Sequence, residues 1–280
     1  MISIVLTHYN RVELLERTLH SFTLNKTNNY EVIIVDDCSH ENEILKLKNL
    51  IKRYKDQIKI KTLFIQKNEK WYDNPCIPFN IGIREASGNI IIIQSAECIH
   101  LGNIIDFTEK RLSDNNYFSF SCYSLNKEQT LNLPNIVAPE HLLNVINPPN
   151  NNPVRDCEES GWYNHPFYRP LGYHWCNAYM KEDLFKLNLF DERFSKGIAY
   201  DDDELSFRSK RLLNLEIIKS PIILHQWHGL GNYYKQTNPI ENQLKQDYNR
   251  DLLDKITRHE SDDSNVVNNL SLSVKYNLYE

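Results

Sequence analysis

Four consecutive acidic residues form the densest group of reactive side chains in the sequence, Asp201-Asp202-Asp203-Glu204. A carboxylate can act as a general base that takes the proton from an attacking hydroxyl group. Acidic residues in the first turn of a helix also stabilise its positive end without any catalytic role, which would account for one or two of the four. Because adjacent carboxylates repel one another, at least one of them is expected to have a partner.

A second group of chemically useful side chains is His225-Gln226-Trp227-His228, which follows the apolar run IIKSPIIL. Imidazole nitrogens are common ligands of divalent metal ions. A single histidine after a strand is more often structural or exposed to solvent. Two histidines with a tryptophan between them are more typical of the rim of a site.

The elements that must position these side chains begin with four apolar, β-branched runs. Each run starts 29 residues after the previous one, and the runs cover residues 2–6, 31–35, 60–66 and 89–94. Helical patterns lie between them, so the order βαβαβαβ predicts an α/β fold with a mostly parallel central sheet flanked by helices. The runs are almost continuously apolar, as expected for strands that are buried on both faces.

The remaining elements follow from periodicity and from capping residues. Asn10 is predicted to cap the first helix, with Glu13 reaching back to it, and Gly88 is predicted to end the third helix. The other predicted helices cover about 41–55, 76–87, 103–114, 181–188, a segment from 201, and 239–257. Strands are predicted at 117–125, 173–180 and 216–224. Residues 132–172 are expected to be irregular, and the polar last twenty residues are a candidate for disorder.

Polar residues follow each of the four apolar runs directly. They are residues 7–10, 36–39, 66–68 and 94–97. Ligands of an open parallel sheet bind beyond the carboxyl ends of its strands. These four positions are therefore the strongest physical indication of a ligand site in the sequence.

Several of these segments resemble the family 2 glycosyltransferases, which have the GT-A fold. ISIVLTHYNR followed by YEVIIVDDCS resembles the opening of that family, and FNIGIREASGNIIIIQSAE is similar to the segment that ends at its Asp-x-Asp motif. CNAYMKEDLFKLNLFDERF and AYDDDELSFR resemble the acceptor-side segment with its Glu-Asp-x-Asp-Leu box. The resemblance implies a GT-A domain over 1–232, with a Rossmann-like nucleotide-sugar-binding half at 1–110 and an acceptor half at 111–232. A C-terminal helical extension and polar tail at 233–280 would follow.

The resemblance also implies an activity. A sugar would pass from a nucleotide-sugar donor, with a UDP-sugar favoured, to a hydroxyl of a glycan or protein acceptor, with inversion. Asp201 and Asp202 take the Glu-Asp positions of the box, and Asp202 is the predicted base. Tyr9 would stack on a pyrimidine base, and Asp36 would accept a hydrogen bond from the base or ribose. The full set of predicted donor-binding residues is Thr7, Tyr9, Asn10, Asp36, Asp37, Asn68, Asn80 and Ser95.

The predicted metal site departs from the family pattern, because Ser95-Ala96-Glu97 stands where Asp-x-Asp is expected. One carboxylate together with phosphate and water oxygens can still bind Mn²⁺ or Mg²⁺. QSAECIH is similar to a Gln-Asn-Pro-Glu-Cys variant with a following histidine, which gives Glu97, and with it His100, a predicted role. The resemblance implies that His225 or His228 joins Glu97 at the metal. The alternative is a catalytically inactive relative that binds a nucleotide or sugar.

Five aromatic residues leave two interpretations open, and one further position departs from the family pattern. Trp71, Trp162, Tyr163, Tyr168 and Trp175 either face sugar rings or belong to the core. Phe79 stands where relatives have an arginine, and the candidate cations that could compensate are Lys67, Lys70 and Arg84.

Composition excludes some classes of protein. The net charge of -5 over 280 residues argues against an electrostatic nucleic-acid binder. No apolar run reaches the length of a membrane span, so no transmembrane segment is expected. Six cysteines without a C-x-x-C pair or a recognisable secretory signal favour a cytoplasmic protein with reduced thiols. A nucleotidyltransferase would need a Gly-rich, basic phosphate loop, which THYNR lacks. The sugar, the linkage and the oligomeric state do not follow from the sequence.

Overall fold

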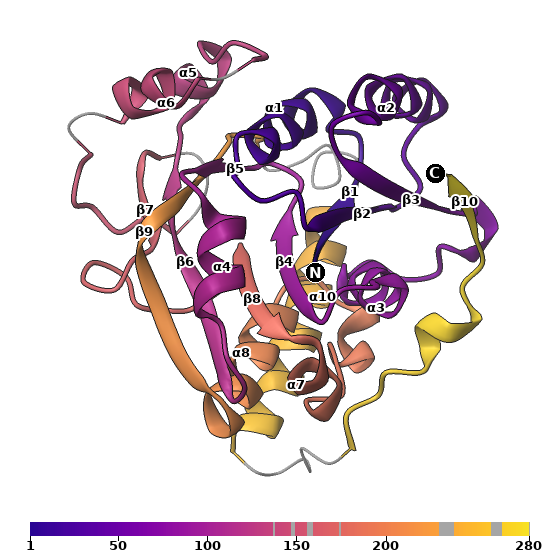
Figure 1. The fold of residues 1–280 in the computed structure, drawn as a ribbon. Coiled ribbons are helices and arrows are strands. Elements are labelled where there is room, and N and C mark those ends of the chain that lie inside the picture. The colour runs from indigo at the N-terminus through magenta and orange to yellow at the C-terminus, as the bar shows by residue number, and fades with distance from the viewer. Residues whose placement is uncertain are drawn as a thin grey trace.

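One mixed β-sheet organises the molecule (Figure 1). The computed structural model describes residues 1–136, 138–146, 149–155, 159–173, 175–229, 238–258 and 265–279. Within these residues the sheet has ten strands in the order β10-β3-β2-β1-β4-β8-β6-β9-β5, and β7 pairs with β6. The strands are β1 Ile2–His8, β2 Tyr30–Asp36, β3 Lys59–Ile65, β4 Ile90–Ser95, β5 Cys98–Leu101, β6 Asn116–Ser124, β7 Gly161–Asn164, β8 Cys176–Met180, β9 Asn214–His225 and β10 Tyr276–Tyr279.

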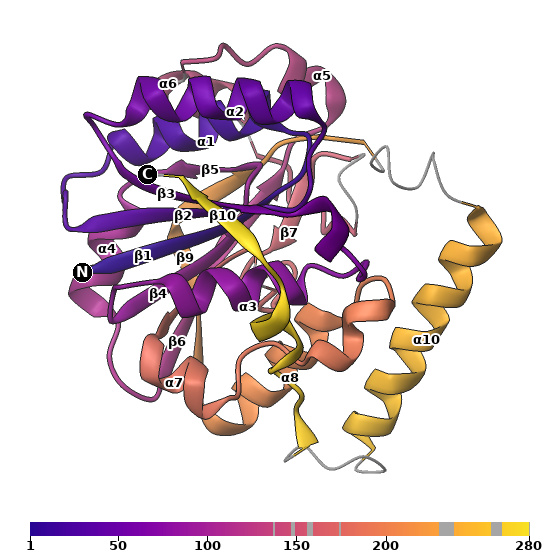
Figure 2. The same cartoon turned by 90° about the vertical axis from the view of Figure 1, so that its right-hand side faces the viewer.

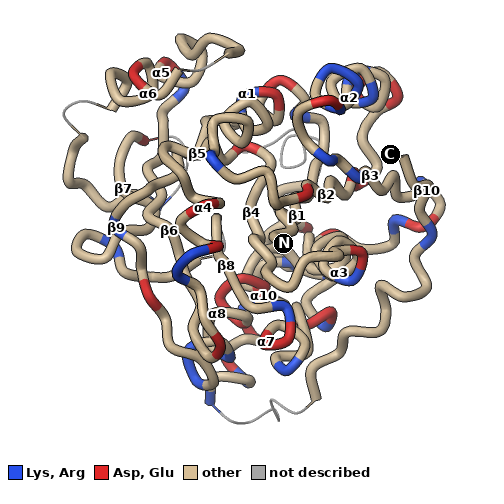
Figure 3. Tube along the Cα trace, viewed as in Figure 1, with Lys and Arg blue, Asp and Glu red and all other residues tan. Residues whose placement is uncertain are grey.

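Helices cover both faces of the sheet, as Figure 2 shows for α1 and α2 on one side and α3 on the other. The helices are α1 Val12–Thr23, α2 Glu41–Tyr54, α3 Cys76–Glu85, α4 Ile104–Arg111, α5 Lys127–Leu131, α6 Pro139–Val145, α7 Lys181–Lys186, α8 Asp201–Leu212 and α10 Pro239–Thr257. Short 3-10 turns occur at η1 Lys67–Glu69, η2 Glu192–Lys196 and η4 Leu270–Ser273. Figure 3 shows both signs of charge mixed along α2, whereas the charged residues of α3 are Arg84 and Glu85 at its end.

The apolar runs form the expected parallel strands, β1 to β4, and these are buried on both faces. Along β1, Ile4 and Leu6 pack with the core under α1, whereas Val5 belongs to the core under α3. This alternation is the period-two pattern of a strand between two helical layers. The predicted α/β fold is therefore confirmed.

Strands from the predicted acceptor half continue the same sheet. β8 pairs with β4 in antiparallel fashion, β6 pairs with β8, and β9 lies between β6 and β5. Strands of both predicted halves therefore share one sheet, and β5 from the first half lies at the far edge beside β9.

Two predicted helix boundaries are wrong. Asn10 does not cap α1, because its φ of 52° places it in the left-handed region and its side chain accepts a hydrogen bond from the His40 N–H at 2.8 Å instead. The third helix ends at Glu85, before Gly88. The Gly88 N–H donates to Ser3 Oγ, and a Cβ at residue 88 would lie 2.7 Å from the Met1 carbonyl oxygen, so this glycine permits close packing against β1.

The polar C-terminal tail is ordered between residues 265 and 279, contrary to the expectation of disorder. β10 pairs in antiparallel fashion with the edge strand β3. The buried carboxylate of Glu192 accepts the N–H groups of Leu270 at 2.6 Å and Ser271 at 3.1 Å. Backbone hydrogen bonds hold this segment in place. A prediction from polarity misses them, because every residue type except proline can donate such a bond. Likewise α6 and β7 interrupt the segment 132–172 that was expected to be irregular.

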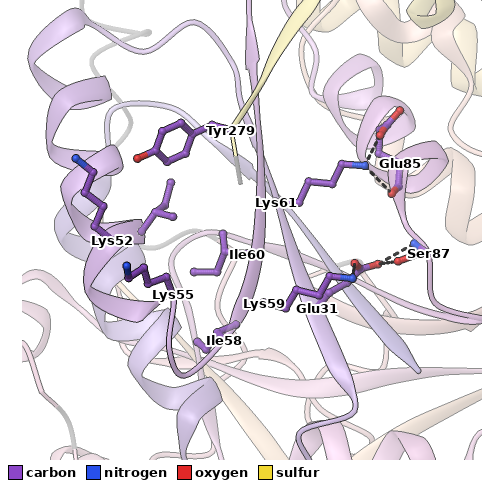
Figure 4. A pocket seen from close by; sticks show the side chains of 11 residues that line it. Glu31, Lys52, Lys55, Ile58, Lys59, Ile60, Lys61, Glu85, Ser87 and Tyr279 are labelled. Atoms are coloured by element: carbon purple, nitrogen blue, oxygen red, sulfur yellow. Dashed lines mark hydrogen bonds and ion pairs between the residues drawn. The ribbon is translucent and has the colours of Figure 1, made fainter.

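A cavity of about 370 Å³ lies at the amino ends of β2 and β3, away from the polar strand ends (Figure 4). Four lysines line it, at positions 52, 55, 59 and 61. Lys59 pairs with Glu31 at 3.3 Å, and Lys61 pairs with Glu85. Two of its four lysines are therefore neutralised by carboxylates of the same cavity.

In the described part of the chain, every helix is too short or too polar to cross a bilayer.

Replacing Gly82 with alanine should destabilise the fold. The added Cβ would lie 2.5 Å from Val5 Cγ1 and 3.0 Å from Val35 Cγ2, where α3 packs on the sheet. Overpacking of this kind costs about 1–3 kcal/mol, against about 1 kcal/mol that alanine gains over glycine in a helix. Urea unfolding should show a net loss of stability. Leu45→Ala, on the exposed face of α2, should change the stability by less than about 0.5 kcal/mol. Equal stability of Gly82→Ala and wild type would contradict this packing.

Candidate active site

The carboxyl ends of β1, β2 and β4 lie at one level of the sheet. Thr7 is in register with Val35 on one side and Ser95 on the other, and His8 is in register with Asp36. The polar residues that follow the strands therefore meet at one edge, as the sequence predicts for a ligand site.

A continuous line of polar contacts crosses this edge. His8 Nε2 accepts the Arg11 N–H at 3.2 Å, so the ring proton resides on Nδ1, which donates to Asp36 Oδ1 at 2.9 Å. Arg11 Nη1 in turn donates to Glu97 Oε1 at 2.8 Å. The end of β2 is thereby connected, through the loop after β1, to the glutamate that follows β4. Sequence reasoning missed both His8 and Arg11, although both lie within the quoted THYNR motif.

Asp36 is fully buried and supports this loop. Its second carboxylate oxygen accepts the Ser39 N–H at 3.1 Å. Both oxygens thus already bind protein groups, and a direct contact between Asp36 and a nucleoside stays a prediction.

Glu97, His225 and His228 converge because β5 and β9 are paired. Cys98 is in register with His225, so Glu97 lies beside the end of β9. Glu97 Oε1 lies 3.6 Å from His225 Nε2 and 3.4 Å from His228 Nε2. Burial alone would raise the pKa of Glu97, but Arg11 and the two histidines hold it well below its usual range. Burial lowers the pKa of His228 to about 4, which leaves that imidazole neutral at pH 7.

These three residues fit a divalent cation. One ligand atom from each lies within 4.8 Å of the others. Both ring nitrogens of His225 and the Nδ1 atom of His228 are buried without a hydrogen-bond partner. Neutral imidazole nitrogens and an ionised carboxylate are typical metal ligands, and a bound cation would satisfy nitrogens that are otherwise orphaned.

Gln226 fixes the position of the two histidines. It is fully buried, and both its backbone N–H and its Nε2 donate to the Glu97 carbonyl oxygen, at 3.1 and 3.0 Å. Its Oε1 accepts from Arg17 Nη1 at 3.1 Å. The amide between the histidines therefore ties β9 to Glu97 and to α1. Sequence reasoning missed Gln226, although it lies between the two histidines of the motif.

The predicted aromatic residues fall into different environments. Tyr163 and Trp175 surround His225, with ring centroids 5.9 and 4.7 Å from the imidazole. Trp162 is buried, and its ring stacks on that of Tyr168 at a centroid separation of 6.2 Å. Trp71 is exposed.

A strained turn presents the acidic cluster. Ala199 and Tyr200 have φ values of 60° and 68°, and α8 begins at the next residue, Asp201. Left-handed backbone at residues other than glycine is costly and persists only where surrounding contacts hold it. Here the Ala199 carbonyl oxygen accepts Nδ2 of Asn74 at 3.3 Å and Nδ2 of Asn249 at 2.8 Å. Asn74 Nδ2 also donates to Asp201 Oδ1 at 3.0 Å.

The four acids have different environments. Glu204 is buried and forms an ion pair with Arg208, which confirms that at least one acid has a partner. Asp201 is also buried, and its Oδ2 has no hydrogen-bond partner. Burial raises the pKa of Asp201 to about 6. Asp202 and Asp203 are half-buried.

The loop after β3 connects the end of β2 to the acidic cluster. Asp37 forms an ion pair with Lys70 and accepts the Tyr72 hydroxyl at 2.8 Å. Asn74, which holds Asp201, follows two residues later. Lys70 Nζ also lies 5.9 Å from the centre of the Tyr9 ring. Among the three candidate compensating cations, Lys70 is thus the one joined to predicted donor-binding residues.

Two other predicted donor-binding residues, Asn80 and Asn68, form side-chain hydrogen bonds to protein groups. Asn80 is fully buried, and its Nδ2 donates to the Phe190 carbonyl oxygen at 2.9 Å and to Glu192 Oε1 at 2.8 Å. It anchors the segment before η2 and presents no exposed atom to a nucleotide. Asn68 is exposed on η1, where its Nδ2 donates to Glu69 Oε1 at 3.3 Å.

His100 and Arg84 also have structural partners away from Glu97. His100 Nε2 hydrogen-bonds Gln94 Oε1 at 2.8 Å, and burial lowers the pKa of this histidine to about 3. It is not part of the possible ligand group formed by Glu97, His225 and His228. Arg84 Nη1 donates to Ser271 Oγ at 2.6 Å, in the C-terminal tail.

Comparison with known proteins gives one family match. The family described as "Glycosyl transferase family 2" matches residues 3–155, which is more than half of the chain. An uncharacterized glycosyltransferase of Rickettsia bellii is 31% identical over 124 residues, 44% of this chain and 16% of that protein. The poly(ribitol-phosphate) beta-N-acetylglucosaminyltransferase TarP of Staphylococcus aureus is 31% identical over 121 residues, 40% of this chain and 34% of TarP. The matches thus span well under half of either relative.

Solved structures show the same fold at low identity. TarS residues 1–349 from S. aureus, in complex with UDP-GlcNAc, superimposes with a TM-score of 0.57 and 13% identity, covering 85% of this chain and 61% of that one. The mannosyltransferase PcManGT from Pyrobaculum calidifontis, in complex with GDP-Man and Mn²⁺, gives a TM-score of 0.53 and 14% identity, covering 84% and 59%. These likenesses confirm the predicted GT-A fold.

The raised pKa of Asp201 predicts a pH dependence of stability. Its folded-state pKa of about 6 exceeds the ordinary value of 3.8, so the fold favours the protonated form. The contribution of Asp201 to stability is therefore present below pH 4 and is lost as the pH rises through 6. The difference between the two values corresponds to roughly 3 kcal/mol. Asp201→Asn should be close to wild type at pH 4 and more stable than wild type at pH 7.5, in urea unfolding at both pH values. Asp251→Asn, on the exposed face of α10, is the control. A stability difference that is the same at both pH values would contradict the assigned burial.

Proposed function

This chain belongs to glycosyl transferase family 2, and we propose that it transfers a sugar from a nucleotide-sugar donor to a hydroxyl group with inversion at the anomeric carbon. The observation that carries the proposal is the convergence of Glu97, His225 and His228 with Arg11 at the carboxyl ends of β1 and β4. A UDP-sugar is the favoured donor, since TarS is described in complex with UDP-GlcNAc. A glycan or a protein hydroxyl is the proposed acceptor.

Donor binding would use the exposed parts of the strand ends. Thr7, Tyr9 and Ser95 are partly exposed at the site edge, so Tyr9 can offer a ring face to the base. Lys70, which pairs with Asp37, would bring an ammonium group near the donor beside Tyr9. Asn10 Nδ2 is buried without a hydrogen-bond partner, and a donor oxygen would satisfy it.

A divalent cation fits Glu97, His225 and His228, and Mn²⁺ or Mg²⁺ held there would offset the negative charge of the departing nucleoside diphosphate. Gln226 keeps the two histidines and Glu97 in place by its three hydrogen bonds to the Glu97 and Leu14 carbonyl oxygens.

The acidic cluster would supply the base. In the proposed reaction the acceptor oxygen bonds to C1 of the sugar as the bond from C1 to the diphosphate oxygen breaks. The acceptor proton passes to a carboxylate, for which we propose Asp202, because Asp202 is half-exposed whereas Asp201 is almost fully buried. Asp201, held by Asn74 at the strained turn, would set the position of that first helical turn.

Nucleotide binding should be selective. In thermal-shift measurements with UDP, GDP, CMP and dTDP, one diphosphate nucleotide should raise Tm most, with UDP expected, and Mn²⁺ should increase that shift. Glu97→Gln should remove the increase due to Mn²⁺, because a neutral amide is a much weaker metal ligand than a carboxylate. Equal shifts for all four nucleotides, or no shift, would contradict a donor site at these strand ends.

Catalysis should depend on Asp202. Asp202→Asn should lower the rate of donor hydrolysis or transfer by about 100-fold or more while the UDP-induced Tm shift is kept, because the base acts in the chemical step and not in donor binding. The exposed Asp251→Asn variant should retain the wild-type rate. Unchanged turnover in Asp202→Asn would remove Asp202 from the mechanism. If the wild type binds the nucleotide but turns over no donor with any acceptor tested, the protein is instead an inactive nucleotide-binding relative.

A further inference from the structure

Arg11 forms an ion pair with Glu97, the carboxylate that the proposed metal requires. Its Nη1 donates to Glu97 Oε1 at 2.8 Å, and the same oxygen is the one nearest to His225 Nε2 and His228 Nε2. A cation held by Glu97 and the two histidines would therefore share an oxygen with a guanidinium group. Two positive charges a few ångströms apart in a buried site repel each other strongly.

Arg11 has the freedom to leave Glu97. Its side chain is 31% exposed, whereas the Glu97 side chain is 5% exposed, so the arginine is the partner that can turn toward solvent. Arg11 also lines a cavity of about 350 Å³ together with Asn10, Trp227 and His228, which gives the guanidinium space beside the ligand group. Its backbone stays fixed by the N–H donated to His8 Nε2. The side chain can therefore move while the loop does not.

We propose that Arg11 competes with a divalent cation for Glu97, and that a nucleoside diphosphate relieves this competition by accepting the guanidinium. Without ligand, Arg11 neutralises the buried carboxylate. When the cation binds, Arg11 turns away and pairs with the diphosphate, since guanidinium groups bind phosphate oxygens in pairs of hydrogen bonds. Metal and nucleotide then bind with positive coupling, because each reduces the cost of displacing Arg11 from Glu97.

This inference rests on the proposed function for the identity of the diphosphate ligand, but metal binding to the free protein tests its first part alone. Mn²⁺ affinity can be measured by electron paramagnetic resonance on the full chain without donor. Arg11→Gln should bind Mn²⁺ at least 10-fold more tightly than wild type, and Arg11→Lys should remain within about threefold of wild type. Arg53→Gln, which removes a surface ion pair with Glu16, is the charge-matched control and should leave the affinity unchanged.

Coupling is measured by repeating the titrations with saturating UDP. The factor by which UDP increases the Mn²⁺ affinity should be at least five times larger for wild type than for Arg11→Gln. Equal or weaker Mn²⁺ binding by Arg11→Gln in the absence of UDP would overturn the competition. If UDP enhances Mn²⁺ binding equally in both proteins, the role of the diphosphate is wrong. A protein that binds Mn²⁺ as predicted but turns over no donor would instead contradict the proposed function.

A measurement on the wild-type protein covers the case in which Arg11→Gln does not fold. With ¹⁵N-labelled arginine, the Nε–H signal of Arg11, assigned by its loss in Arg11→Lys, should shift as Mg²⁺ is added. The signal of Arg53 should not move. An Arg11 signal that stays in place while Mg²⁺ binds would show that arginine and cation do not compete, and would overturn the proposal.

Discussion

The burial of one carboxylate constrains the whole site. Glu97 is almost completely removed from water, and an isolated charge in such a place is strongly unfavourable unless it is paired. Its partners come from distant parts of the chain, the loop after β1 and the end of β9. The sheet must therefore bring β1, β4, β5 and β9 together for Glu97 to be tolerated. The same requirement assembles a cluster of a carboxylate, two imidazoles and a guanidinium where a charged ligand can bind.

The C-terminal part of the chain supports the candidate site from outside the strands that form it. Asn249 of α10 holds the Ala199 carbonyl oxygen in the strained turn before the acidic cluster. Gly197, which precedes this turn, packs so closely on Asn249 that a Cβ could not fit between them. The tail then returns to cover the edge of β3 as β10. Helix α10 and strand β10 therefore support the acidic turn and the sheet, respectively.

The sequence predicts the strands and their polar ends well, because burial on both faces leaves a long apolar run and ligands gather where such runs stop. The acidic cluster and the two histidines can also be predicted, because each is a local group of residues of one chemical type. The roles of His8, Arg11 and Asn249 cannot be predicted from the sequence, because they depend on contacts across 28, 86 and 50 residues of sequence. Asn80 shows the opposite error, since a polar side chain near a predicted site is used to anchor a buried loop.

The proposed site requires a diphosphate and a divalent cation to meet at Glu97. The most direct measurement is anomalous diffraction at the manganese edge from crystals soaked with UDP and Mn²⁺. We expect one strong peak within bonding distance of Glu97, His225 and His228, with the diphosphate beside Arg11 and the uracil against Tyr9. A nucleotide bound in the lysine-lined cavity at the opposite end of the sheet, or a Glu97 still paired with Arg11 beside a bound diphosphate, would contradict it.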